Sequence, residues 1–132
     1  MKSIWLLISA FIALAWGYTP PTNNTWGPLL LPDTTHPVTQ GQPFKITWDP
    51  AGHPTKGVTV SLVLCRGPST NCVLQKKAIV EGVPARRKQY LWDVPDNLRP
   101  AKAGTKNGAG MLIIVDGTGE FQYSTQFSIL AN

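Results

Sequence analysis

Residues 111–129 have the sequence Met111-Leu112-Ile113-Ile114-Val115, Asp116-Gly117-Thr118-Gly119-Glu120 and Phe121-Gln122-Tyr123-Ser124-Thr125-Gln126-Phe127-Ser128-Ile129. The first segment is continuously apolar, as expected of a strand that is buried on both faces. The Asp-Gly-Thr-Gly stretch is typical of a tight hairpin turn. The last segment alternates, with its odd-numbered positions facing one way, which is the period of a half-buried strand. These residues therefore predict two antiparallel strands joined by a short turn.

The same patterns recur upstream, about every 10–15 residues. Alternating runs bounded by turn-forming residues predict further strands at residues 37–40, 44–48, 58–64, 73–81 and 88–93. With the two C-terminal strands this makes about seven, and no helical segment longer than one or two turns is predicted. The pattern indicates an all-β fold, an antiparallel β-sandwich of immunoglobulin or fibronectin type.

Length and composition agree with this fold class. The chain has 132 residues, of which 42% are hydrophobic, so it has room for one domain with a core. Gly and Pro number 12 each, and such frequent interruption excludes a helical bundle or a coiled coil. It also argues against a Rossmann-type enzyme, which needs long crossover helices.

The N-terminus has the layout of a secretory signal peptide. Met1-Lys2-Ser3 precedes the apolar run Ile4–Ala15, and Ala15-Trp16-Gly17 fits the small-x-small cleavage rule. We therefore expect a signal peptide over residues 1–17 and a mature chain that starts at Tyr18, with cleavage after Ala15 as the alternative. The run is too short to span a bilayer, so we expect a secreted protein with no stable membrane anchor.

Residues 18–28 are rich in Pro and Asn and predict an extended, exposed segment before a single β-sandwich domain over residues 29–132. Within this segment Asn23-Asn24-Thr25 is an acceptor for N-glycosylation, at Asn23. Trp26 has the best prospect of exposure among the tryptophans and is the candidate for a carbohydrate contact. Folding back over a sheet edge is the alternative for Trp26.

Cys65 and Cys72 are the only two cysteines. An even number in a secreted chain favours a disulfide, and the residues between them are rich in turn formers. If the flanking segments pair as a hairpin, the two residues come within bridging range. Two unpaired buried thiols are the alternative. We expect no metal site and no cofactor, because His36 and His53 lie too far along the chain for a recognisable zinc spacing.

The sequence offers little catalytic equipment. A glycosidase needs two carboxylates across a cleft, but nearly all the carboxylates fall at predicted turns and strand ends: Asp33, Asp49, Glu81, Asp93, Asp96, Asp116 and Glu120. No Gly-x-Ser-x-Gly nucleophile motif is present. We therefore expect no enzymatic activity.

A basic cluster stands before two aromatic residues, Tyr90 and Trp92. It consists of Lys76, Lys77, Arg86, Arg87 and Lys88. Interleaved charge and aromatic rings can bind nucleic acid or an acidic polymer. A secreted protein rarely meets nucleic acid, so no nucleic-acid partner is expected, and charged strand edges that block strand addition explain the cluster equally well.

Four segments, in order, resemble the N-terminal domain of the fungal yeast-cell-wall-synthesis family, found in the killer-toxin-resistance proteins of β-1,6-glucan assembly. Pro37–Trp48 is similar to its opening V-x-x-G-x-x-x-x-I-x-W pattern. Val58–Leu64 followed by Arg66–Asn71 is similar to its second block, a strand that runs into an R-G-P-S-x-N turn. Tyr90–Pro95 is similar to its Y-x-W-x-x-P block. Phe121–Ile129 is similar to its closing Y-S-x-x-F-x-I strand. The domain also occurs in Ser/Thr-rich, glycolipid-anchored surface proteins of fungi.

The resemblance implies a secreted, non-enzymatic protein of the cell wall or extracellular matrix. Its expected partners are a wall polysaccharide such as β-glucan, or wall proteins, and its expected role is to support wall organisation. The family offers no agreed catalytic residues. Two alternatives stay open: a secreted interaction protein that acts on a host or a competitor, and, with less support, a small polysaccharide-active enzyme.

Overall fold

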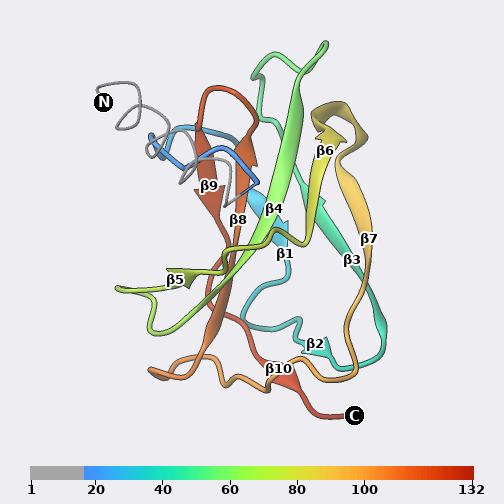
Figure 1. Cartoon of the computed structure of the whole chain (residues 1–132), viewed down its shortest axis with the longest axis vertical. Coiled ribbons are helices and arrows are strands. Elements are labelled where there is room, and N and C mark those ends of the chain that lie inside the picture. Colours follow the sequence, from blue (N-terminus) through green and yellow to red (C-terminus); the bar gives the residue numbers. More distant parts are fainter. Residues whose placement is uncertain (1–16) are drawn as a thin grey trace, which may run out of the picture.

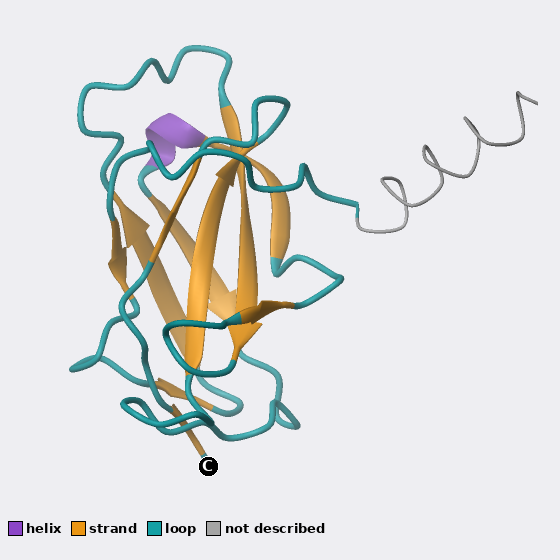
Figure 2. Cartoon of the chain, turned by 90° about the vertical axis from the view of Figure 1, so that its left-hand side faces the viewer, coloured by secondary structure: helices purple, strands orange, loops and turns teal. Residues whose placement is uncertain are grey.

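A computed structural model describes residues 17–132, which form ten strands and one short 3-10 helix, η1 (Ala85–Arg87) (Figure 1). Two sheets face each other as separate layers (Figure 2). The expected immunoglobulin-like β-sandwich is thereby confirmed. Apart from Gly17, the predicted signal peptide lies outside the described residues.

The first sheet has three antiparallel strands in the order β1 (Leu29–Leu31), β3 (Pro43–Trp48) and β7 (Gln89–Asp93). In the second sheet β4 (Thr59–Arg66) pairs with β8 (Ala109–Val115), and β8 pairs with β9 (Phe121–Tyr123). The other edge of β4 takes two strands, β5 (Val73–Leu74) and β6 (Val80–Pro84). A short parallel pair of β2 (Val38–Thr39) and β10 (Ile129–Leu130) completes the fold.

The main core fills the space between the sheets, and Trp48 is its largest fully buried side chain. The indole Nε1 of Trp48 donates a hydrogen bond to the Ala85 carbonyl at 2.8 Å, so the polar atom of this ring is satisfied. Trp92 is also buried. Trp48 and Trp92 therefore both help to fill the core between the sheets.

A second, smaller apolar cluster covers the opposite face of the second sheet. Alternate residues of β8 divide between the clusters: Met111 and Ile113 face the main core, whereas Leu112 and Ile114 face the second cluster. All seven residues of β8 are buried. The prediction of a strand buried on both faces is therefore confirmed.

Two predicted strands are broken in the structure. Residues 73–81 were expected as one strand, but β5 and β6 are separated by an exposed segment that contains Lys76 and Lys77. Residues 121–129 were also expected as one strand, and β9 ends at Tyr123. There the Ser124 hydroxyl accepts a hydrogen bond from the Met111 N–H at 3.1 Å and takes over a position in the ladder.

The N-terminal segment is exposed only in part: residues 22–25 are exposed as expected, whereas Tyr18, Trp26 and Gly27 are buried. Its backbone runs along the edge of β9, where the Phe121 N–H donates to the Asn23 carbonyl at 2.9 Å and the Trp26 N–H donates to the Phe121 carbonyl at 3.2 Å. Tyr18 is buried in the second cluster. Because an open sheet edge gains hydrogen bonds from any extended chain beside it, the segment serves as a further partner for β9.

The disulfide between Cys65 and Cys72 is confirmed, with a Cα–Cα distance of 5.3 Å. It closes a loop between β4 and β5, which pair antiparallel through Cys65↔Leu74 and Arg66↔Val73. We call residues 65–74 the disulfide hairpin. The hairpin arrangement that was expected to bring the two cysteines together is the one observed.

Removal of this disulfide is predicted to lower stability. Replacing both cysteines by alanine should reduce the free energy of unfolding by roughly 2–3 kcal/mol, because the short loop would no longer restrict the unfolded chain. Urea unfolding followed by tryptophan fluorescence measures the change, with Ser69→Ala in the same loop as the control. Equal stability of the double variant and the wild type would contradict the prediction.

Tyr18 is predicted to make stability sensitive to alkali. Burial raises the pKa of its phenol, so the folded protein keeps this proton where the unfolded chain loses it. Its contribution is therefore complete below the ordinary tyrosine pKa of about 10 and is lost as the pH rises above that value. The Tyr18→Phe variant should lose less stability between neutral and alkaline pH than the wild type does.

At neutral pH the same variant should be less stable by about 1 kcal/mol, because the hydroxyl of Tyr18 donates a hydrogen bond to the Gln75 carbonyl at 2.7 Å. Urea unfolding on both sides of pH 10 measures both effects. Tyr123→Phe, at a ring that is 54% exposed, is the control. An identical pH dependence in Tyr18→Phe and in the wild type would disprove the assignment.

Candidate functional site

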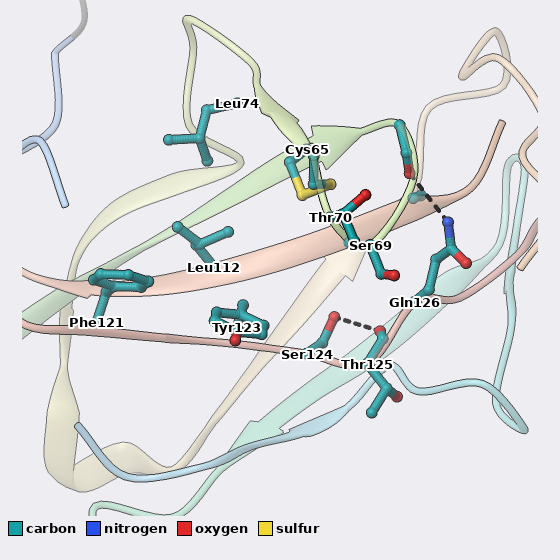
Figure 3. A pocket seen from close by; sticks show the side chains of 14 residues that line it. Cys65, Ser69, Thr70, Leu74, Leu112, Phe121, Tyr123, Ser124, Thr125 and Gln126 are labelled. Carbon is teal, nitrogen blue, oxygen red and sulfur yellow. Dashed lines mark hydrogen bonds between the residues drawn. A yellow bond between two sulfur atoms is a disulfide. The ribbon is translucent and has the colours of Figure 1, made fainter. Parts of the chain in front are cut away.

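A groove of about 500 Å³ lies on the outer face of the second sheet, between the disulfide hairpin and β9 (Figure 3). The floor is formed by β8, with Ala109, Gly110 and Leu112. One wall carries the disulfide and Leu74, and the other carries the rings of Phe121 and Tyr123. We call it the aromatic groove.

The floor of the groove is low because β8 places a glycine under the disulfide. A Cβ atom at Gly110 would lie 2.8 Å from the Sγ of Cys65 and 3.2 Å from the Sγ of Cys72. The sulfur atoms therefore rest directly on the backbone of β8. A larger residue at this position would have to push the disulfide hairpin outward.

The aromatic wall consists of two rings from the same strand. Phe121 and Tyr123 are two residues apart on β9, and their ring centroids lie 6.3 Å apart at an interplanar angle of 33°. Phe121 is half-buried against the second cluster, whereas Tyr123 is 54% exposed. The wall thus offers an aromatic ring on a rigid strand for a ligand to stack against.

Polar side chains gather at one end of the groove. Exposed Ser69 and Thr70 from the disulfide hairpin face Thr125 across the opening (Figure 3). Among the residues that the structure describes, no Asp, Glu, Lys, Arg or His belongs to the lining. A largely apolar groove with a few hydroxyl groups at its rim favours an uncharged ligand that combines apolar faces with hydroxyl groups.

Gln126 holds the polar end in place. Its Nε2 donates hydrogen bonds to the carbonyls of Gly67 at 3.0 Å and Thr105 at 2.8 Å, and its Oε1 accepts one from the Gly104 N–H at 2.6 Å. A Cβ atom at Gly108 would lie only 1.9 Å from this Nε2, so the glycine leaves room for the amide. One side chain therefore ties the disulfide hairpin to the loop before β8.

The site residues predicted from the sequence are only partly brought together here. Cys65 and Cys72 form one wall of the groove. Asn23 is exposed on the N-terminal segment, and its glycosylation stays a prediction. Trp26 is 5% exposed and packs in the main core, with its ring centroid 6.1 Å from that of His53. The expectation of an exposed Trp26 is therefore wrong, and the alternative of folding back over a sheet edge is what occurs.

The basic cluster does not gather in the aromatic groove. Lys76 and Lys77 line a separate, more open groove beside Tyr90 and Trp92, whereas Arg86 and Arg87 belong to η1. Sequence reasoning missed the Phe121–Tyr123 wall, because an alternating strand pattern shows that the two residues share a face but not what lies opposite that face. The small residues Ala109 and Gly110, opposite the end of β4, were the available signal for a hollow at this place.

Two of the aspartates, Asp33 and Asp116, serve local structure. Asp33 accepts hydrogen bonds from Thr35, and its Oδ1 lies 2.8 Å from the Nδ1 of His36; these bonds, above all the one with His36, hold the pKa of Asp33 below its usual range. Asp116 accepts hydrogen bonds from Thr59 at 2.6 Å and Ser61 at 2.7 Å. Within residues 17–132 no three His, Cys, Asp or Glu residues gather as a metal-binding group.

In the described part of the chain, η1 is neither long nor apolar enough to cross a membrane, and no other helix is present there.

Comparisons with known proteins identify the family but no individual relative. Neither the search of curated proteins nor the search of solved structures gave a match. A family model described as the Kre9/KNH-like N-terminal Ig-like domain matches residues 31–129. This range includes the second sheet, β3 and β7 of the first sheet, and every described residue that lines the aromatic groove. The resemblance seen in the sequence is confirmed, and the chain belongs to the Kre9/KNH-like N-terminal Ig-like domain family.

Proposed function

We propose that this chain is a secreted, non-catalytic protein of the cell wall or extracellular matrix that binds a wall polysaccharide and supports wall organisation. Membership of its family implies a role in the assembly of the yeast cell wall. The polymer class we propose is β-glucan, and the aromatic groove is the proposed site. Binding to other wall proteins is a second way in which the same role could be performed.

The observation that carries this proposal is the exposed ring of Tyr123 on the wall of an uncharged groove. A neutral sugar ring has an apolar C–H face and a rim of hydroxyl groups. The face can stack on an aromatic ring, while the hydroxyl groups need hydrogen-bonding partners at the edge of the contact. Tyr123 supplies the ring, and Ser69, Thr70 and Thr125 supply hydroxyl groups.

The placement of the carboxylates supports a non-catalytic role. Both oxygens of Asp116 accept hydrogen bonds from hydroxyl groups of β4, and Glu120 accepts one from Thr25 at 3.1 Å. Glycoside hydrolysis needs two carboxyl groups that flank the bond to be cleaved. None of the described residues that line the aromatic groove is a carboxylate, so a polymer bound there would lie against no carboxyl group of this lining.

Tyr123→Ala is predicted to weaken the binding of insoluble β-glucan. Loss of an aromatic contact worth about 1–1.5 kcal/mol should lower the affinity roughly five- to tenfold. The recombinant protein, with its disulfide intact, would be titrated against suspensions of β-glucan, chitin and mannan, and the unbound fraction measured. Tyr123→Phe keeps the ring and should bind like the wild type.

A control variant on the other sheet separates the groove from the general surface. Leu91→Ala removes a side chain on β7 that is 59% exposed, close to the exposure of Tyr123, and should leave binding unchanged. Equal binding by Tyr123→Ala and the wild type would remove the groove from the proposal. Binding to none of the polymers would favour an interaction protein, and cleavage of any of them would favour an enzyme.

A further inference from the structure

A further pocket, of about 500 Å³, is lined by residues at the C-terminal end of β4. That end of β4 lies at the end of the sandwich opposite to η1 (Figure 1). Three of the pocket's seven lining residues are cations and none is an acid. The lining comprises Arg66, Gly67, Arg99, Pro100, Lys106, Asn107 and Gly108. We call it the cationic pocket.

The positive charges in this pocket are uncompensated. Within residues 17–132 the only ion pair joins Asp33 and His36, so neither Arg66 nor Arg99 has a carboxylate partner. Partial burial and the nearby charge of Arg99 both lower the pKa of Arg66. Two like charges held close together are unfavourable unless an anion lies between them or beside them.

The two arginines are held close by the backbone around them. The guanidinium of half-buried Arg66 donates a hydrogen bond to the Pro100 carbonyl at 3.3 Å, next to Arg99 in the chain. This bond uses one of the five N–H groups of the guanidinium. The remaining groups form a fork that suits two oxygen atoms of one ligand group.

The loop that carries Lys106 is also fixed. The Lys102 N–H donates to the Asn107 carbonyl at 2.9 Å, and the Thr105 hydroxyl donates to the Lys102 carbonyl at 2.8 Å. The Gly67 N–H donates to the Gly108 carbonyl at 3.0 Å, which joins this loop to the end of β4. The backbone that carries the three cations is therefore held in place by hydrogen bonds before any ligand binds.

We propose that the cationic pocket binds an oxyanion group of the phosphate or sulfate class, with Arg66 as its half-buried anchor and Arg99 and Lys106 at its mouth. The lining is too polar for an apolar ligand, and among the described residues it offers hydrogen-bond donors and positive charge but no acid. Tyr123 is not part of the lining, so this inference stands whether or not the aromatic groove binds a glucan.

The first experiment uses inorganic phosphate as the probe. The disulfide-bonded protein is titrated with phosphate at constant ionic strength against chloride, which keeps general screening unchanged. Backbone amide resonances of Gly67 and Gly108 and the side-chain Nε–H of Arg66 are followed by NMR. We expect saturable shifts confined to these groups, with sulfate as a competitor.

Variants of single charges identify the site. Arg99→Gln should weaken phosphate binding roughly fivefold or more, as expected when one charged ligand contact is lost. Arg87→Gln on η1 removes the same charge at the opposite end of the sandwich and should leave the affinity unchanged. Lys106→Gln is a second test variant and should also weaken phosphate binding. Because Lys106 is exposed, this variant still tests the proposal if Arg99→Gln fails to fold.

Thermal unfolding supplies an independent readout. Phosphate should raise the unfolding temperature of the wild type more than chloride does, and Arg99→Gln should abolish the difference. In chloride alone Arg99→Gln should be at least as stable as the wild type, because one of two repelling charges is gone. A merely structural role for Arg99 would instead lower stability in both salts.

The source of the anion is separated by further probes. Mannose 6-phosphate against mannose tests a phosphorylated sugar, and vesicles of phosphatidic acid against phosphatidylcholine test a lipid headgroup. Saturable binding of any phosphate probe that is lost in Arg99→Gln but kept in Arg87→Gln supports the proposal. Shifts that stay linear with concentration, or an equal loss in both variants, would overturn it.

Discussion

The antiparallel ladder between β4 and β8 supports both apolar clusters of the molecule. Seven residue pairs join the two strands, from Val60↔Val115 to Arg66↔Ala109. Since side chains alternate between faces, each strand contributes to the core between the sheets on one side and to the second cluster on the other. The outer face of the second sheet is therefore apolar. The N-terminal segment and the disulfide hairpin both pack against this face. Both the aromatic groove and the cationic pocket lie at the Arg66 end of this ladder.

Local periodicity predicted those strands in which each face of the strand keeps the same surroundings along its whole length. Met111–Val115 has no polar position, and the structure buries it on both sides. The odd-numbered positions of residues 121–129 were expected to face one way, but Phe121 packs against the second cluster, whereas Phe127 and Ile129 lie in the main core. These two residues form β-bridges to other segments and do not continue β9. Periodicity reports which side of the chain is buried, but it does not report which partner buries it.

The site was harder to predict than the fold because it combines three separate segments. The disulfide followed from the turn residues between Cys65 and Cys72, which is local information. The aromatic groove also needs Gly110 beneath the sulfur atoms and Tyr123 on the neighbouring strand, and only the tertiary register brings these together. Trp26 illustrates the same limit: a Pro- and Asn-rich segment has no periodicity, so the hydrogen bonds between its backbone and β9 could not be foreseen.

The aromatic groove is uncharged and the cationic pocket is positive, yet one side chain, that of Gln126, contacts residues of both. Gln126 lines the aromatic groove, and its amide binds the carbonyl of Gly67, a residue that the two linings share. The same amide holds Thr105 in the loop that carries Lys106. A displacement of the disulfide hairpin would move Gly67 and strain these bonds, so the shape of the neutral groove and the spacing of the cations depend on the same contacts. The disulfide thus fixes more than the loop it closes: through Gly67 and Gln126 it also positions the frame of a pocket to which neither cysteine contributes a lining atom.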